Sequence, residues 1–124
     1  MGALNILLVD DDQNLVTTLS YGLRKAMGDE VSVTICFSGS EALSMLTTQR
    51  FDVVISDIGL PDGTGHDLMK QIKERYRIPG VALTGYGMED DLRRSSEMGF
   101  AEHVVKPVNI AHLQSVIRRV ARSK

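Results

Sequence analysis

Acidic, hydroxyl and amine side chains directly follow short apolar runs at several points in the chain. They are Asp10 and Asp11 after the first run, Asp57 after the third, Thr84 after the fourth and Lys106 after the fifth. If the runs are parallel strands, their carboxyl ends share one edge of a sheet, where α/β proteins bind ligands. Clustered carboxylates repel one another, and a hard divalent cation relieves that repulsion. Oxygen ligands without paired Cys or His favour Mg²⁺ over Zn²⁺.

A magnesium site next to a lysine amine and a threonine hydroxyl is also a receptor for a phosphoryl group, because such a site neutralises the charge of the transferring group. Asp57 would then be the nucleophile, since a carboxylate can accept phosphate as an aspartyl-phosphate. Its own stretch, 51–65, is rich in Gly and Pro after the apolar run. That stretch alone leaves a second interpretation open, in which Asp57 only caps a turn.

The apolar runs alternate with segments of helical periodicity. The runs are 4–9, 31–36, 53–55, 81–83 and 103–105. Five β/α units predict a parallel sheet with helices on both faces, which is a flavodoxin-like (βα)5 three-layer sandwich. The run 31–36 alternates apolar with polar residues, as an edge strand does, and this favours the strand order 2-1-3-4-5.

Capping residues mark the expected helix starts. They are Asp12, Ser38 with Glu41 three residues later, Thr64 with Asp67, and Asn109. The window around 88–98 has few large apolar residues, so the fourth helix is expected to be weakly anchored.

Composition indicates one domain over residues 1–124. The chain has 124 residues, of which 43% are hydrophobic, enough for one core. A net charge of −2 and a pI near 5.9, with no dominant basic patch, give no reason to expect nucleic acid as a partner. One cysteine, no signal peptide and no long apolar span predict a cytoplasmic, soluble protein without membrane contact.

Over essentially its whole length the sequence resembles the receiver domains of two-component response regulators. The matching motifs are Val9-Asp10-Asp11, Asp57-Ile58-Gly59-Leu60-Pro61 with Gly65, Leu83-Thr84-Gly85 and Lys106-Pro107. The resemblance implies that Asp57 takes a phosphoryl group from a phosphohistidine of a histidine kinase or histidine phosphotransfer partner. The resulting switch would alter partner binding, and no enzyme activity on an external substrate is expected.

The resemblance also implies roles for the other residues of the site. Asp11, Asp57 and the Gly59 carbonyl would ligate Mg²⁺, with Asp10 acting partly through water and with Mn²⁺ as an alternative ion. Lys106 would hold a phosphoryl oxygen, and Thr84 would move to bond another. The Lys106-Pro107 peptide would be cis.

Two further stretches, 82–87 and 103–108, look like receivers fused to hybrid sensor histidine kinases, so the chain is expected to be an excised domain or a free-standing receiver. The family commonly dimerises through its fourth and fifth elements, which makes a homodimer an expectation here.

The switch position departs from the family pattern. Three residues before Lys106, where Tyr or Phe is common, this chain has His103. We therefore predict that Thr84 and the fourth helix respond to phosphate while His103 reports the change less strongly. Tyr86, two residues after Thr84, is predicted to shield the acyl phosphate, and Gly59 offers no side chain to steer an attacking water.

Two other functions use the same residue types. A phosphatase of the haloacid-dehalogenase type also has an Asp nucleophile and Mg²⁺, but it needs a second Asp two residues later, where this chain has Gly59. A non-catalytic pseudo-receiver would bind partners only, and the complete set of acids, Thr84 and Lys106 argues against it.

Overall fold

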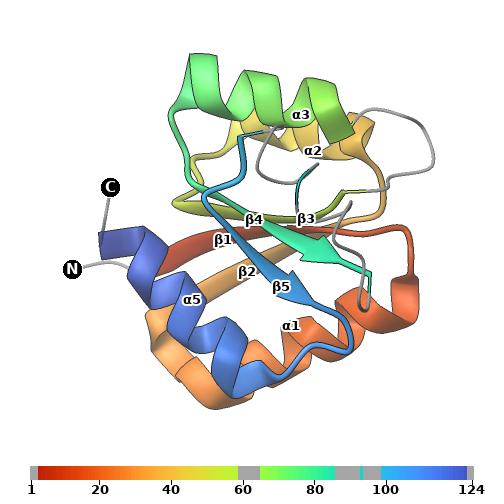
Figure 1. Ribbon diagram of the computed structural model, residues 1–124. Helices are drawn as coiled ribbons and strands as arrows, with labels where there is room; N and C mark the ends of the chain where they lie inside the picture. The colour runs from red at the N-terminus through yellow and green to blue at the C-terminus, as the bar shows by residue number, and fades with distance from the viewer. Residues whose placement is uncertain (1–2, 59–64, 86–92, 94–98, 123–124) are drawn as a thin grey trace.

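The computed structural model describes residues 3–58, 65–85, 93 and 99–122, and shows one five-stranded sheet between two layers of helices (Figure 1). The strands are β1 (Leu4–Val9), β2 (Val31–Cys36), β3 (Val53–Asp57), β4 (Gly80–Thr84) and β5 (Glu102–Val105). The helices are α1 (Gln13–Met27), α2 (Gly39–Thr48), α3 (Gly65–Gln71) and α5 (Ile110–Arg122), with a short 3-10 turn at Gly28–Glu30 and a π-helical turn at Ile72–Tyr76.

All strand pairs are parallel and the order is β2-β1-β3-β4-β5, which confirms the predicted topology. The half-polar strand β2 lies at an edge, where Ser32 is exposed while Val31 and Val33 are buried. The inner strands β3 and β4 are buried almost throughout, as continuous apolar runs predict for a sheet covered on both faces.

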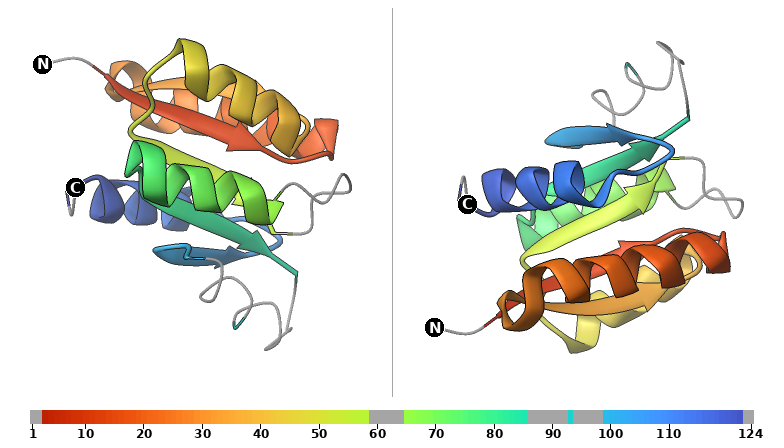
Figure 2. Two further views of the ribbon diagram at one scale, coloured as in Figure 1. Left: turned by 90° about the horizontal axis from the view of Figure 1, so that it is seen from above. Right: turned by 90° about the horizontal axis from the view of Figure 1, so that it is seen from below.

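The helices cover the sheet in pairs. Helices α1 and α5 lie on one face and α2 and α3 on the other (Figure 2). Ile6, Leu8 and Ile55 pack toward α1 and α5, while Leu7 and Val54 pack toward α2 and α3. Each fully buried side chain of this size contributes about 1.5–3 kcal/mol. A one-residue slip in register would turn these side chains to the opposite face of the sheet. The alternation along β1 and β3 therefore holds the strand register, and with it the strand ends that stand side by side.

Three of the predicted caps are confirmed. Asp12 Oδ1 accepts a hydrogen bond from the Leu15 N–H at 3.1 Å, and Asn109 Oδ1 accepts one from the His112 N–H at 3.0 Å. Ser38 Oγ accepts from the Glu41 N–H at 3.2 Å. The Glu41 carboxylate also accepts a hydrogen bond, from the Phe37 N–H at 3.3 Å. In a standard capping box this bond would come from the N–H of the cap residue, Ser38, one residue later in the chain.

The third helical segment ends in a way that its sequence did not predict. After α3 the backbone widens into the π turn, and Arg77 then adopts a left-handed conformation with φ 55° and ψ 44°. The Ile78 N–H donates to the Ile72 carbonyl at 3.1 Å, which closes the turn and directs the chain into β4. The predicted start at Thr64 and the predicted fourth helix fall outside the described residues, apart from the isolated helical residue Arg93.

No helix within the described ranges is long and apolar enough to cross a membrane.

Candidate functional site

The carboxyl ends of four neighbouring strands, β1, β3, β4 and β5, bring the predicted residues together. Asp57 is the last residue of β3, and Asp10 directly follows β1, where its N–H donates to the Cys36 carbonyl at 3.2 Å. Lys106 follows β5, and its N–H donates to the Thr84 carbonyl at 2.9 Å. Sheet register thus places residues that are far apart in the sequence at one edge.

Three carboxylates form a cluster at this edge. Each of Asp10, Asp11 and Asp57 offers an oxygen, and these atoms all lie within 4.8 Å of one another. The Asp10 side chain is 1% exposed, that of Asp57 is 17% exposed, and Asp11 faces solvent. An all-oxygen donor set with one open side fits a hard divalent cation such as Mg²⁺.

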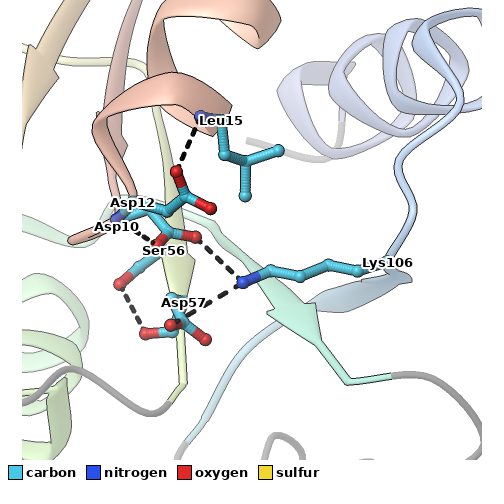
Figure 3. Close-up of polar contacts among 6 residues, drawn as sticks. All are labelled: Asp10, Asp12, Leu15, Ser56, Asp57 and Lys106. Carbon is cyan, nitrogen blue, oxygen red and sulfur yellow. Dashed lines mark hydrogen bonds and ion pairs between the residues drawn. The ribbon is translucent and has the colours of Figure 1, made fainter.

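Lys106 lies between two of these acids. Its Nζ is 3.1 Å from Asp10 Oδ2 and 3.8 Å from Asp57 Oδ2 (Figure 3). One ammonium group therefore faces both the buried acid, Asp10, and the predicted nucleophile, Asp57. The Lys106-Pro107 peptide is cis, as the resemblance implied.

Burial raises the pKa of the Asp10 carboxyl above its usual value, and the negative charge of Asp57 adds to the rise. The Asp12 N–H, which donates to Asp10 Oδ1 at 3.0 Å, and Lys106 pull in the opposite direction without cancelling it. The ionised Asp10 carboxylate is thus held at a cost that a bound cation would relieve.

Thr84 is fully buried at the end of β4. Its hydroxyl has no hydrogen-bond partner in the described part of the chain. Buried hydroxyl groups are normally hydrogen-bonded, so this one is an available donor next to the acidic cluster.

Ser56 is a residue of the site that sequence reasoning missed. It is fully buried on β3, and its hydroxyl donates to the Asp57 carbonyl at 3.0 Å (Figure 3). A polar residue inside an apolar run, just before the predicted nucleophile, was the signal that could have identified it. The bond links Ser56 to the backbone of Asp57.

His103 is not brought into the cluster. It is exposed on β5 and pairs in register with Ala82, whereas Val105 pairs with Thr84. Gly59 and Tyr86, for which a carbonyl ligand and a shielding ring were predicted, lie outside the described residues.

Comparison with known proteins decides the family. The sequence model of one protein family, the response regulator receiver domain, matches residues 6–118 of this chain. The chain belongs to this family. The sequence-based prediction of a two-component receiver is therefore confirmed, and receiver domains generally bind Mg²⁺, for which the acidic cluster is suited.

Relatives agree in sequence and fold. The receiver is 34% identical over 120 residues to the response regulator protein FleR of Pseudomonas aeruginosa, covering 96% of this chain and 25% of FleR. It is 28% identical to the chemotaxis response regulator CheY4 of Vibrio cholerae, with a TM-score of 0.82 over 95% of this chain and 98% of that one.

A third similarity concerns the fold alone. The receiver domain of a Saccharomyces cerevisiae response regulator, solved together with a histidine phosphotransfer signalling protein, matches with a TM-score of 0.85 and 24% identity. The match covers 98% of this chain and 90% of that one.

Proposed function

We propose that Asp57 is the phosphoacceptor of this receiver. The observation that carries the proposal is the position of Asp57 at the end of β3, with Lys106 Nζ 3.8 Å away and with Asp10 and Asp11 in the same 4.8 Å cluster. Turn capping alone would not require these three partners. Asp10, Asp11, Asp57 and the Gly59 carbonyl would hold Mg²⁺, with Mn²⁺ as an alternative ion.

The reaction is a transfer from nitrogen to oxygen. A carboxylate oxygen of Asp57 attacks the phosphorus of a phosphohistidine, a P–O bond forms, and the P–N bond breaks as the imidazole leaves. When bound, the cation would neutralise charge on the transferring group. Lys106 contributes a second positive charge next to Asp57, which lowers the electrostatic barrier between two anions.

Thr84 would report the transfer. Its buried hydroxyl, unpartnered among the described residues, can donate to a phosphoryl oxygen on Asp57. The Thr84 carbonyl accepts from the Lys106 N–H at 2.9 Å, so a shift of Thr84 pulls on the chain after β5. Altered partner binding would follow. We further predict that His103 reports the change less strongly and that Tyr86 shields the acyl phosphate.

The partner class follows from the reaction. A phosphohistidine is carried by a histidine kinase or a histidine phosphotransfer protein, and a protein of this fold was solved with the latter. We place the receiver in the cytoplasm, as one domain over residues 1–124, either free-standing or part of a hybrid kinase. A homodimer through the fourth and fifth elements belongs to the same proposal.

Mass spectrometry after incubation with acetyl phosphate and Mg²⁺ tests the proposal. We expect one phosphoryl adduct that is absent with EDTA and absent in Asp57→Asn. Asp29→Asn, an exposed acid in the 3-10 turn, is the matched control and should be modified like the wild type. Turnover of an external phosphate ester would instead indicate a phosphatase, and the absence of any adduct would indicate a pseudo-receiver.

A further inference from the structure

Ser56 is a polar residue at a position where the sheet is otherwise apolar. It directly precedes Asp57 on β3, and it is 0% exposed. Its register partners are Val9 on β1 and Ala82 on β4, which are also fully buried. Burial of a hydroxyl group among apolar side chains costs free energy unless the group is hydrogen-bonded. The role of Ser56 therefore depends on the partner that its hydroxyl contacts.

Side-chain alternation separates Ser56 from the reacting groups. Val54, two residues earlier on β3, and both register partners of Ser56 belong to the core between the sheet and the α2–α3 layer. Successive side chains of a strand point to opposite faces, so Ser56 lies on this side too. Figure 3 shows its hydroxyl and the Lys106 ammonium group on opposite sides of Asp57 in this view. Ser56 therefore acts on Asp57 through the backbone and not through the carboxylate.

The backbone group that Ser56 contacts is the peptide that joins Asp57 to Ile58. Its carbonyl, that of Asp57, accepts the hydrogen bond from Ser56 Oγ at 3.0 Å. Its N–H, that of Ile58, donates to the Leu83 carbonyl at 3.4 Å, which is longer than the usual range of about 2.7–3.2 Å. Of these two hydrogen bonds to the peptide, the one from Ser56 is the shorter.

This peptide lies where the chain leaves the sheet. The last register pair between β1 and β3 is Val9 with Ser56, so the pairing with β1 ends before Asp57. On the other side, Asp57 still pairs with Leu83 of β4. The N–H and C=O of a trans peptide point in opposite directions, so the Asp57 carbonyl points toward the side of β1. Ser56 thus supplies a hydrogen bond on the side where strand pairing has ended.

The orientation of this peptide determines where the following residues lie. A rotation of its plane would shift Ile58, and Gly59 after it, relative to the Asp57 carboxylate. In the proposed site, that carboxylate and the Gly59 carbonyl would bind the same cation. Mg²⁺ requires near-ideal octahedral geometry, so displacement of one ligand relative to another weakens binding. Groups that orient metal ligands from behind therefore influence the affinity of a site.

We infer that Ser56 is a positioning residue of the receiver. Its hydroxyl holds the peptide between Asp57 and Ile58, so that the Asp57 carboxylate and the Gly59 carbonyl meet one Mg²⁺ ion in a single geometry. The inference rests on the metal site of the proposed function. The competing explanation is a serine that only satisfies its own hydroxyl, and it predicts a change in stability without a change in metal affinity.

Titration of the unphosphorylated protein with Mg²⁺, followed by amide chemical shifts, tests this inference. Ser56→Ala should raise the Kd for Mg²⁺ about three- to ten-fold, which corresponds to the net free energy of one hydrogen bond. The Ile58 amide should also exchange faster with solvent in this variant. Ser56→Cys keeps the size of the side chain but is a weak donor, so it should resemble Ser56→Ala. Ser56→Thr keeps a hydroxyl group and should have the Kd of the wild type.

Ser20→Ala is the matched control, because Ser20 is also a buried serine, 4% exposed on α1. It should leave the Kd for Mg²⁺ at the wild-type value. Urea denaturation in EDTA measures the stability of each variant, so that Kd is compared among folded proteins. An unchanged Kd in Ser56→Ala, an equal rise in Ser20→Ala, or a Kd of Ser56→Thr as high as that of Ser56→Ala would each overturn the inference.

This test is separate from the test of Asp57 as phosphoacceptor. A wild-type protein that binds Mg²⁺ but gives no adduct with acetyl phosphate would refute the proposed role of Asp57, and the comparison of Ser56→Ala with Ser20→Ala would still stand. An adduct on the wild type together with an unchanged Kd in Ser56→Ala would refute the role of Ser56 alone.

Discussion

Replacing Asp10 by Asn is expected to stabilise the metal-free receiver and to remove most of its stabilisation by Mg²⁺. Asp10 is buried and shares a 4.8 Å cluster with Asp11 and Asp57, so its charge is repelled by two others. Asparagine keeps the shape of the side chain and an oxygen that can accept from the Asp12 N–H. The substitution therefore removes charge with little change in packing.

The expected gain follows from opposing charge interactions. At 4.8 Å and an effective dielectric constant of about 20, the repulsion between Asp10 and Asp57 is roughly 3.5 kcal/mol. The repulsion between Asp10 and Asp11 is weaker, because Asp11 is exposed to solvent. The attraction between Asp10 and Lys106 at 3.1 Å is about 5 kcal/mol in the same medium, reduced by solvent because Lys106 is 30% exposed. When the cost of burying the carboxylate is added to these charge interactions, we expect Asp10→Asn to raise the free energy of unfolding by about 1–2 kcal/mol.

The raised pKa of Asp10 agrees with this sign. The folded protein holds the Asp10 proton more tightly than the unfolded chain, so the contribution of Asp10 to stability falls as pH rises from 3.8 through its folded pKa. The advantage of Asp10→Asn should therefore grow over that interval and stay constant above it.

Magnesium should reverse the order of stability. Ligand at 100 times its dissociation constant stabilises a folded protein by about 2.7 kcal/mol. The wild type should gain this amount, whereas the variant, which lacks one carboxylate of the site, should gain little.

Urea denaturation followed by circular dichroism, in EDTA and in Mg²⁺, measures both effects. Asp29→Asn makes the same chemical change at an exposed position of the 3-10 turn and should leave both values near those of the wild type. An Asp10→Asn variant that is less stable than the wild type in EDTA would show that the Lys106 ion pair dominates. Equal stabilisation of variant and wild type by Mg²⁺ would remove Asp10 from the metal site.

Three further predictions concern single side chains. Arg77→Gly should raise the free energy of unfolding by about 1 kcal/mol, since a left-handed conformation costs an L-residue roughly 1–2 kcal/mol and glycine little; an unchanged urea midpoint would contradict this. Thr84→Val should stabilise the unphosphorylated receiver by about 1 kcal/mol, because it removes a buried hydroxyl that lacks a partner among the described residues. The same variant should lose the chemical shift changes in β5 that phosphorylation causes, and their survival would exclude Thr84 as the reporter. The hydrogen bonds from Arg119 lower the pKa of Glu102 below its usual value, so this ion pair stabilises the fold above pH 4.5 and is lost as pH falls through the folded pKa. Glu102→Gln should therefore lower the urea midpoint at pH 7 and leave it unchanged near pH 2.

The sequence by itself determined the fold class and most of the candidate site. Continuous apolar runs predicted the buried inner strands, and the alternating run 31–36 predicted the edge strand, because side-chain burial follows strand position directly. Acids, Thr84 and Lys106 at strand ends predicted the site, since parallel strands bring their carboxyl ends to one edge.

Tertiary structure decided what depends on distance and on packing between segments. Only the fold shows that Lys106 lies nearer to Asp10 than to Asp57, and that Asp10 is the buried acid of the pair. The π turn and the left-handed Arg77 arise from the closure of α3 onto β4, for which the local sequence contains no glycine signal.

The placement of segments that are distant in the sequence is the clearest difference. Parallel β/α units return the chain to the same end of the sheet after each helix, and this brings the end of α2 beside the end of the π turn. This proximity arises from topology, which no local pattern of residues encodes.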